Sequence, residues 1–310
     1  MSFRNKLYFL VVILLLMVGC STKEIPAAAT LENAEQNSEI EAENQTIIEE
    51  VQNDESIEES TLSAAPRDLV FNAADGTQLE GRFYPSKNSF APLIMLYHWA
   101  PGDQYDWRVI ASWLQNRGLL VDDTAVETES IPWLDISWFP VIPESESYNV
   151  FTYTFRNCKG GCSSFEREKW YEDVKGAVDF TVGIEGIDTK KIIMIGASIG
   201  SDGAVDGCAY LHQISPGSCL GAFSISPGNY LTIDFAEKVQ ELQTIPVWCL
   251  YAETDVESAQ ICEDLDLENF SQFSYPASMI YANGHGMNLI EKNQDPNPLS
   301  LMIQFLEELS

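Results

Sequence analysis

KKIIMIGASIGSDGAV, residues 190–205, joins an apolar, β-forming run to a Gly-x-Ser-x-Gly pentapeptide. Ile192, Ile193 and Ile195 predict a buried strand, and the small residues after the pentapeptide suit a helix. A serine on such a strand-to-helix turn can be a catalytic nucleophile that the glycines leave uncrowded. It can also be incidental, because so short a pattern recurs by chance. The decision depends on a base and an acid elsewhere in the chain.

Strands and helices alternate along residues 66–310. Asp75-Gly76 predicts a hairpin turn, and the apolar run 92–97 is typical of a strand covered on both faces. This order predicts an α/β fold, with a mostly parallel, doubly wound sheet and an antiparallel N-terminal edge hairpin. Further strands are predicted over 149–155, 191–195, 222–225, 247–251 and 273–281, and helices over 107–118 with Gly118 as the stop, 163–182 opened by a serine cap, after Ser198, and over 298–309.

The chain has three histidines, so the base that would serve Ser198 can be searched exhaustively. His285 follows the last predicted strand between two glycines, which allow a loop to present its imidazole. His212 is expected past the helix after Ser198, away from the carboxyl ends of the strands. Asp255 follows an apolar strand and is the acid candidate, with Glu253 left open as an alternative. Ser198, His285 and Asp255 thus make a candidate nucleophile, base and acid.

The chain order Ser, Asp, His at successive strand ends resembles the α/β-hydrolase superfamily. The resemblance covers residues 67–310 and is carried by GASIG, YAETD, NGHG and the turn after His98. It implies that Ser198 attacks a carbonyl group, that His285 moves the proton, and that Asp255 orients the imidazole.

The resemblance also implies two backbone donors for an oxyanion. One is the N–H of Ile199, directly after the serine. The other comes from the turn HWAPGD, with Ala100 N–H as the first candidate and Trp99 N–H as the alternative. Related hydrolases have a glycine where Trp99 stands, so the second donor is the weaker assignment. His98 is expected to brace this turn rather than to take part in the chemistry.

A second departure from the superfamily pattern follows the strand 149–155. Relatives often carry an Asp-x-Arg-Gly turn there, whereas this chain reads TFRNCKGGC, with Thr154 in the place of the acid. Arg156 is retained and is expected to brace loops through carboxylate contacts. The cysteines Cys158 and Cys162 suggest that the turn is closed by a disulfide.

Six of the seven cysteines lie in residues 66–310; the seventh, Cys20, belongs to the N-terminal segment described below. An even number of cysteines can pair as disulfides in an oxidising compartment. Local pairing predicts Cys158–Cys162 and Cys208–Cys219, with Cys249–Cys262 as the weakest pair. Buried free thiols are the alternative. A zinc site is not expected, because CKGGC has no second chelating pair at a suitable spacing.

Residues 121–147 are longer than a helix-to-strand connection requires. They contain three prolines, seven acidic residues and the large apolar side chains of Trp133, Trp138 and Phe139. Such side chains must pack somewhere, and both a lid or pocket wall and a clamp over a sheet edge fit the composition.

The first 65 residues differ in character from the rest. Residues 1–20 begin with Arg4 and Lys6, continue with a short apolar run and end in Met-Val-Gly-Cys, which resembles the lipobox of bacterial lipoproteins. The resemblance implies cleavage before Cys20, acylation of Cys20 and a membrane tether; an ordinary signal peptide or an uncleaved anchor helix is the alternative. Residues 21–65 hold twelve acidic residues against one lysine and no aromatic residue, which predicts a disordered acidic tether.

These features predict an extracytoplasmic, lipid-anchored serine hydrolase of the cell envelope that cleaves a small-molecule carboxylic ester. A peptidase or amidase of the same fold, and a binding protein with a vestigial site, are the alternatives. The chemistry requires no cofactor, the acidic residues show no metal-site spacing, and a formal net charge of −30 argues against nucleic-acid partners. An apolar acyl or aryl pocket is expected from four aromatic residues on loops: Trp99, Trp107, Trp138 and Tyr230.

Overall fold

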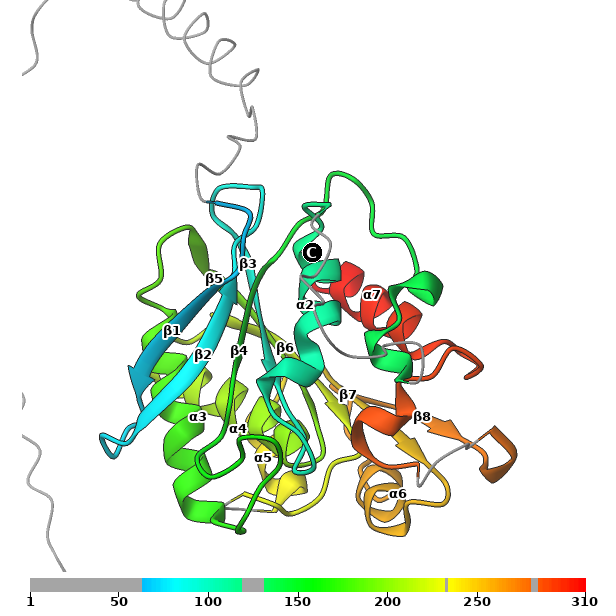
Figure 1. Cartoon of the computed structure of the whole chain (residues 1–310). Helices are drawn as coiled ribbons and strands as arrows, with labels where there is room; N and C mark the ends of the chain where they lie inside the picture. The colour runs from blue at the N-terminus through cyan, green and yellow to red at the C-terminus, as the bar shows by residue number, and fades with distance from the viewer. Residues whose placement is uncertain (1–62, 119–130, 232–233, 280–283) are drawn as a thin grey trace, which may run out of the picture. The chain divides into compact units, whose positions relative to one another are not determined.

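The computed structural model describes residues 63–118, 131–231, 234–279 and 284–310. In this part of the chain, eight strands form one sheet in the order β1-β2-β4-β3-β5-β6-β7-β8 (Figure 1). β2 is antiparallel to β1 and β4, and every other neighbouring pair is parallel. The predicted α/β architecture with an antiparallel edge hairpin is confirmed. The strands are β1 (Arg67–Asn72), β2 (Gln78–Tyr84), β3 (Ala91–Tyr97), β4 (Asn149–Tyr153), β5 (Ile187–Ala197), β6 (Cys219–Ile225), β7 (Val247–Ala252) and β8 (Phe270–Tyr275).

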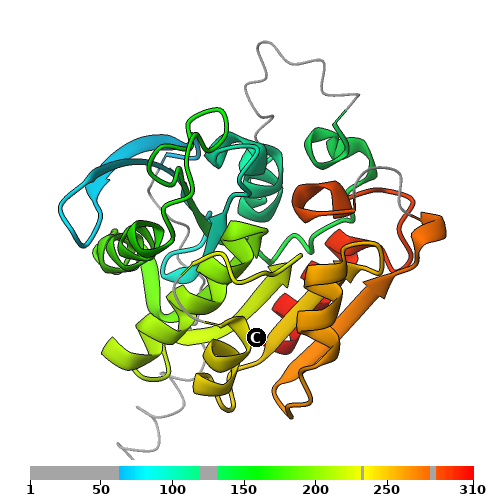
Figure 2. The same ribbon diagram turned by 90° about the horizontal axis from the view of Figure 1, so that it is seen from below.

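Helices cover both faces of the sheet (Figures 1 and 2). α2 and α7 pack on one face, where Ile94, Ile195 and Leu250 belong to the same apolar cluster as Leu114 and Phe305. α3, α4 and α5 pack on the other face, and α6 lies against β7 and β8. The helices are α2 (Arg108–Gln115), α3 (Arg167–Thr181), α4 (Ile199–Ile214), α5 (Phe235–Glu241), α6 (Val256–Glu263) and α7 (Pro298–Glu308).

The central strands are apolar along their length because each is covered on both faces. Five consecutive residues of β3, Leu93–Tyr97, are all buried, and so are the last six of β5. A continuous apolar run of this kind is what a parallel strand between two helical layers requires. The parallel strands bring their carboxyl ends to one edge of the sheet, where the predicted site residues follow them.

Some predicted boundaries are wrong in detail. α3 begins at Arg167 after Glu166, and no serine side chain caps it; Ser164 instead bonds the carboxylate of Glu166. α2 ends at Gln115, and the next residue, Asn116, caps it with a left-handed backbone (φ 48°), two residues before the predicted stop at Gly118. His212 lies within the last turn of α4 rather than beyond it.

The structure pairs all six predicted disulfide cysteines. Cys158–Cys162 closes a loop after β4, Cys208–Cys219 joins α4 to the start of β6, and Cys249–Cys262 joins β7 to α6. The local pairing expected from the sequence is therefore the pairing found, and each bond fastens a connection that flanks a central strand.

The segment 121–147 is described from Ile131 onward. It forms two short 3-10 turns, η3 (Pro132–Leu134) and η4 (Ile136–Trp138). Trp133 is buried edge-on against Trp99, with ring centroids 5.6 Å apart, and Phe139 packs in the same way on Trp113 of α2. The apolar side chains thus do pack, on α2 and on the turn that follows β3.

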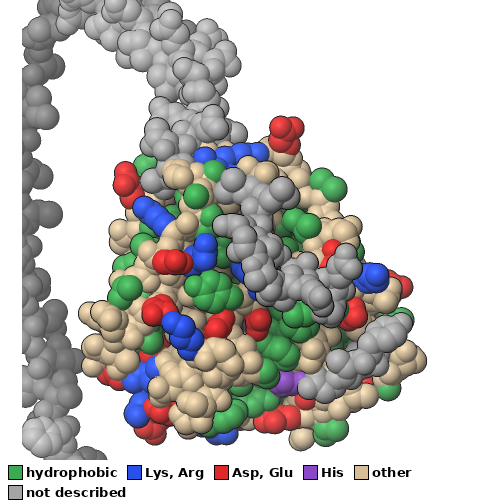
Figure 3. Space-filling model, in the orientation of Figure 1, with side chains coloured by type: hydrophobic (Ala, Val, Ile, Leu, Met, Phe, Trp, Pro, Cys, Tyr) green, Lys and Arg blue, Asp and Glu red, His purple; other side chains and the backbone are tan. Residues whose placement is uncertain are grey.

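The surface carries both signs of charge. On the face in Figure 3, Asp and Glu side chains are scattered with Lys and Arg between them rather than gathered into one patch. No helix in the described ranges is long and apolar enough to cross a membrane.

Candidate active site

Ser198 stands on a tight turn between β5 and α4. Its backbone has φ 55° and ψ −121°, a strained conformation for a residue with a side chain, and its N–H donates to Ile225 O at 2.8 Å. A Cβ on Gly196 would overlap the carbonyl oxygen of Gly200, and a Cβ on Gly200 would overlap the carbonyl oxygens of Tyr97 and His98. Both glycines of the Gly-x-Ser-x-Gly sequence are therefore required by close backbone packing.

The three residues predicted as nucleophile, base and acid lie in one hydrogen-bonded line. His285 Nε2 is 2.8 Å from Ser198 Oγ, and His285 Nδ1 is 2.6 Å from Asp255 Oδ2. With the Nδ1 proton donated to the carboxylate, the Nε2 lone pair faces the serine hydroxyl. Gly284 and Gly286, which flank the histidine, have φ of 67° and 60°, so only glycine fits this loop without strain. The arrangement can take a proton from Ser198.

The environment of Asp255 favours its ionised form. Ser258 Oγ donates to Asp255 Oδ2 at 2.7 Å, so that one oxygen accepts from both serine and histidine. Burial by itself would raise the pKa of Asp255, but the bonds from His285 and Ser258 outweigh it and hold the pKa below its ordinary value. Glu253, the alternative acid, is exposed, and the structure brings Asp255 to the histidine.

The turn that would supply the second oxyanion donor comprises residues 98–103 and is called the oxyanion turn below. His98 is fully buried; its Nδ1 lies 2.7 Å from Trp99 O, and its Nε2 accepts from Phe155 N at 3.0 Å. Burial lowers the pKa of His98 to about 4, so the ring is neutral near pH 7 with its one proton on Nδ1. His98 thus ties the oxyanion turn to the end of β4, as expected for a bracing residue.

The two predicted donors come from two different turns, Ile199 from the serine turn and Ala100 from the oxyanion turn. Ile199 is the first residue of α4, and the first N–H groups of a helix have no acceptor within it. Ala100 N–H shares a trans peptide group with Trp99 O, which accepts from both His98 Nδ1 and Gly102 N. The two hydrogen bonds to Trp99 O therefore fix this peptide group and with it the direction of the Ala100 N–H. The donor role of Ile199 and Ala100 stays a prediction.

Trp99 fills the space beside Ser198. Its indole N–H donates to Asp106 Oδ2 at 2.6 Å. A Cβ on Gly286 would lie 2.9 Å from the indole and 3.5 Å from the Cβ of Ser198. The tryptophan is therefore part of the site wall. Trp107 is not, because it is fully buried in the core beneath α2, which corrects its assignment to the pocket.

Arg156 braces the loops as predicted. Its guanidinium bonds Asp75 at 2.6 and 3.0 Å and Asp173 at 2.6 and 2.8 Å, which links the β1–β2 hairpin to α3. The Arg156 hydrogen bonds hold the pKa of Asp75 far below its usual range. Thr154, in the place of the missing acid, accepts weakly from Gln104 N at 3.4 Å.

The sequence reading missed Asp202, a buried acid in the first turn of α4. Its carboxylate accepts from Gly228 N at 3.0 Å and from Tyr230 N at 2.6 Å, which fixes the loop after β6. Tyr230 in turn packs edge-on against His285, with centroids 6.2 Å apart. An acidic residue among the small, apolar residues of SDGAVDG is the signal that could have revealed it. Burial raises the pKa of Asp202 to about 8.

Metal-binding residues do not cluster in this part of the chain. Across the described ranges, no group of three or more His, Cys, Asp or Glu side chains could hold a metal ion. The polar side chains at Ser198 form one hydrogen-bonded line with His285 and Asp255.

No protein-family model and no curated relative matches this chain. Solved structures do. The chain superposes on the α/β hydrolase GrgF from Penicillium sp. sh18 with a TM-score of 0.52 and 11% identity over 79% of this chain and 98% of that one. DcsB, solved with a substrate analogue, gives a TM-score of 0.52 at 11% identity over 79% and 99%. The esterase Pf2001 of Pyrococcus furiosus gives 0.50 at 13% identity over 79% and 91%. The chain has the α/β-hydrolase fold.

Proposed function

We propose that this chain is a serine hydrolase that cleaves a small-molecule carboxylic ester through an acyl-enzyme formed on Ser198. The observation that supports it best is the continuous line from Ser198 Oγ through His285 to Asp255 Oδ2, with separations of 2.8 and 2.6 Å. A structural serine needs neither a strained backbone nor a histidine aligned by a carboxylate. The esterase and hydrolase among the similar structures agree with this reading.

The reaction would proceed in two halves. Ser198 Oγ attacks the ester carbonyl while His285 Nε2 takes its proton, and the carbonyl oxygen becomes an oxyanion that accepts from Ile199 N–H and Ala100 N–H. His285 then gives the proton to the departing alcohol oxygen, which leaves Ser198 acylated. A water molecule repeats the sequence on the acyl-enzyme and regenerates the free serine. Asp255 stays ionised and stabilises the imidazolium in both halves, in keeping with its lowered pKa.

A fluorophosphonate probe tests the proposal on the full chain. The probe should label the unmutated protein at Ser198, and Ser198→Ala and His285→Ala should lose the label together with p-nitrophenyl ester hydrolysis. Ser215→Ala, a serine at the opposite end of α4, is the matched control and should label fully. A folded wild-type protein that takes no label would favour a binding protein with a vestigial site. Labelling with turnover of amides but not of esters would favour an amidase or peptidase.

The same proposal includes a lipid anchor at Cys20 that tethers the protein to a membrane of the cell envelope. Cys20 and the tether up to residue 62 lie outside the described residues, so the support comes from the sequence and from the disulfides, which suit an oxidising compartment. Cys20→Ser should move the protein from the membrane fraction to the soluble fraction. Membrane retention of that variant would instead indicate an uncleaved anchor helix.

A further inference from the structure

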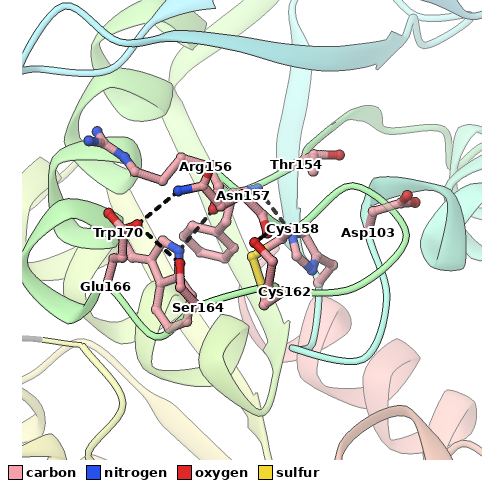
Figure 4. Close-up of a disulfide and its surroundings, with 12 residues drawn as sticks. Asp103, Thr154, Arg156, Asn157, Cys158, Cys162, Ser164, Glu166 and Trp170 are labelled. Carbon is pink, nitrogen blue, oxygen red and sulfur yellow. Dashed lines mark hydrogen bonds between the residues drawn. A yellow bond between two sulfur atoms is a disulfide. The ribbon is translucent and has the colours of Figure 1, made fainter.

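The loop closed by Cys158–Cys162 is tightly turned. Inside it Gly160 and Gly161 have positive φ, of 70° and 111°, and Asn157, directly before it, has φ 60°. Cys158 N donates to Phe155 O at 3.1 Å and Gly161 N to Cys158 O at 3.0 Å, so the chain turns back on itself twice. Figure 4 shows the disulfide with Asp103 on one side and Asn157 and Glu166 on the other. The loop thus lies between the oxyanion turn and the start of α3.

This loop holds the oxyanion turn through its backbone. Cys162 N donates to Ala100 O at 2.7 Å, and Gly160 N donates to Asp103 Oδ2 at 2.8 Å. Gly161 packs so closely that a Cβ there would lie 2.9 Å from Pro101 O. The middle of the turn and its last residue are therefore both bonded to the loop that the disulfide closes.

Ala100 is held at both of its peptide groups. The peptide that carries its N–H is fixed through Trp99 O by His98, and the peptide that carries its carbonyl is fixed by Cys162 N. His98 is itself fixed by Phe155 N, three residues before Cys158. Apart from the bond from Gly102 N to Trp99 O, these bonds depend on the chain between Phe155 and Cys162, whose last five residues the disulfide closes into a loop.

We infer that the Cys158–Cys162 disulfide is a positioning element for the second oxyanion donor, so that turnover depends on it although neither cysteine touches the substrate. The inference rests on the proposed function. Constraint of the unfolded chain is expected to be smaller for this bond than for the other two, because its cysteines are four residues apart and close the shortest loop of the three disulfides. The bond also keeps Gly160 and Gly161 in the conformation from which Gly160 N reaches Asp103 and Cys162 N reaches Ala100.

The first test compares two disulfide removals in the full chain. Cys158→Ala with Cys162→Ala should lower kcat by about 10- to 100-fold, a large part of what loss of one oxyanion donor costs, and should change KM by no more than about twofold. Cys208→Ala with Cys219→Ala, at the end of α4 far from Ser198, is the matched control and should keep kcat near the wild-type value. Unchanged kcat in the first pair, measured per fluorophosphonate-titrated site, would overturn the inference and leave the proposed function standing. A wild type without label or turnover would overturn both.

A second variant leaves the disulfide intact. Gly161→Ala should push on Pro101 O and lower kcat, whereas Gly217→Ala, which also has positive φ but open space around it, should cost stability alone. An alkylboronic acid gives a readout specific to the oxyanion, because its tetrahedral adduct on serine places an oxygen where the oxyanion forms. Its Ki should rise by the same factor as kcat falls in Gly161→Ala. A Ki unchanged against a lowered kcat would show that the loop acts by another route.

Discussion

The two sides of Ser198 use different parts of the chain. On the side of Asp255 and His285, side chains make the line. Each of these residues lies on a loop that follows a parallel strand, Asp255 after β7 and His285 after β8. On the side of the oxyanion turn, the predicted donor is a peptide N–H group, and most of the bonds that hold its turn come from another loop, 155–162. A catalytic side chain can be recognised in the sequence by its residue type. A backbone N–H donor cannot, because every residue except proline has one and its position depends on packing.

The largest effect is expected on the side-chain half of this comparison. Asp255→Asn should lower kcat by about 10⁴-fold, because an amide can no longer hold the Nδ1–H tautomer of His285. Glu253→Gln is the matched control: it makes the same acid-to-amide change two residues away, on an exposed side chain, and should leave kcat unchanged. Steady-state kinetics with one p-nitrophenyl ester measures both. Equal losses would mean that the acid has been assigned to the wrong residue.

On the backbone half, His98→Ala should lower kcat by about 10²-fold, since Trp99 O keeps only its longer bond from Gly102 N and the Ala100 peptide is held less firmly. His98→Asn offers an amide N–H near the position of Nδ1 and should recover part of the loss. The recovery separates positioning from general damage to the fold. If both variants had equal kcat, the bond to Trp99 would have no part in turnover.

The contrast also explains what sequence alone could predict. The triad, the sheet and the three disulfides follow from residue types and strand order. Trp107 was wrongly assigned to the pocket, because the sequence near a loop border does not show whether a tryptophan ring points into the core or toward the site. Trp99 could be recognised as a departure from glycine, but its bond to Asp106 and its contact with Gly286 depend on a loop conformation. The 155–162 loop contacts Ala100 through a backbone hydrogen bond, which cannot be predicted from residue types.

The pH dependence of stability gives a third way to examine the backbone half. Between pH 6.5 and 4 the unfolded chain protonates His98 while the folded chain, with a pKa of about 4, does not. The free energy of unfolding should therefore fall as the pH drops through this window, by about 3 kcal/mol from this residue. Urea unfolding of wild type and His98→Asn at pH 7 and pH 4.5 measures it, and the variant should lose less. The difference isolates His98, because Asp173, whose pKa burial raises to about 6, acts in the opposite direction in both proteins.

The smallest effect is expected from a residue that supports the triad without belonging to it. Ser258→Ala removes one of the two donors to Asp255 Oδ2 and leaves the His285 bond in place. The carboxylate then keeps its stronger, charge-assisted partner, so kcat should fall by only about 3- to 10-fold, equivalent to roughly 1 kcal/mol. A loss as large as that of Asp255→Asn would show that Ser258, rather than the histidine, fixes the rotamer of the carboxylate. The Ser198–His285–Asp255 line would then depend on supporting residues outside it, as the oxyanion turn does.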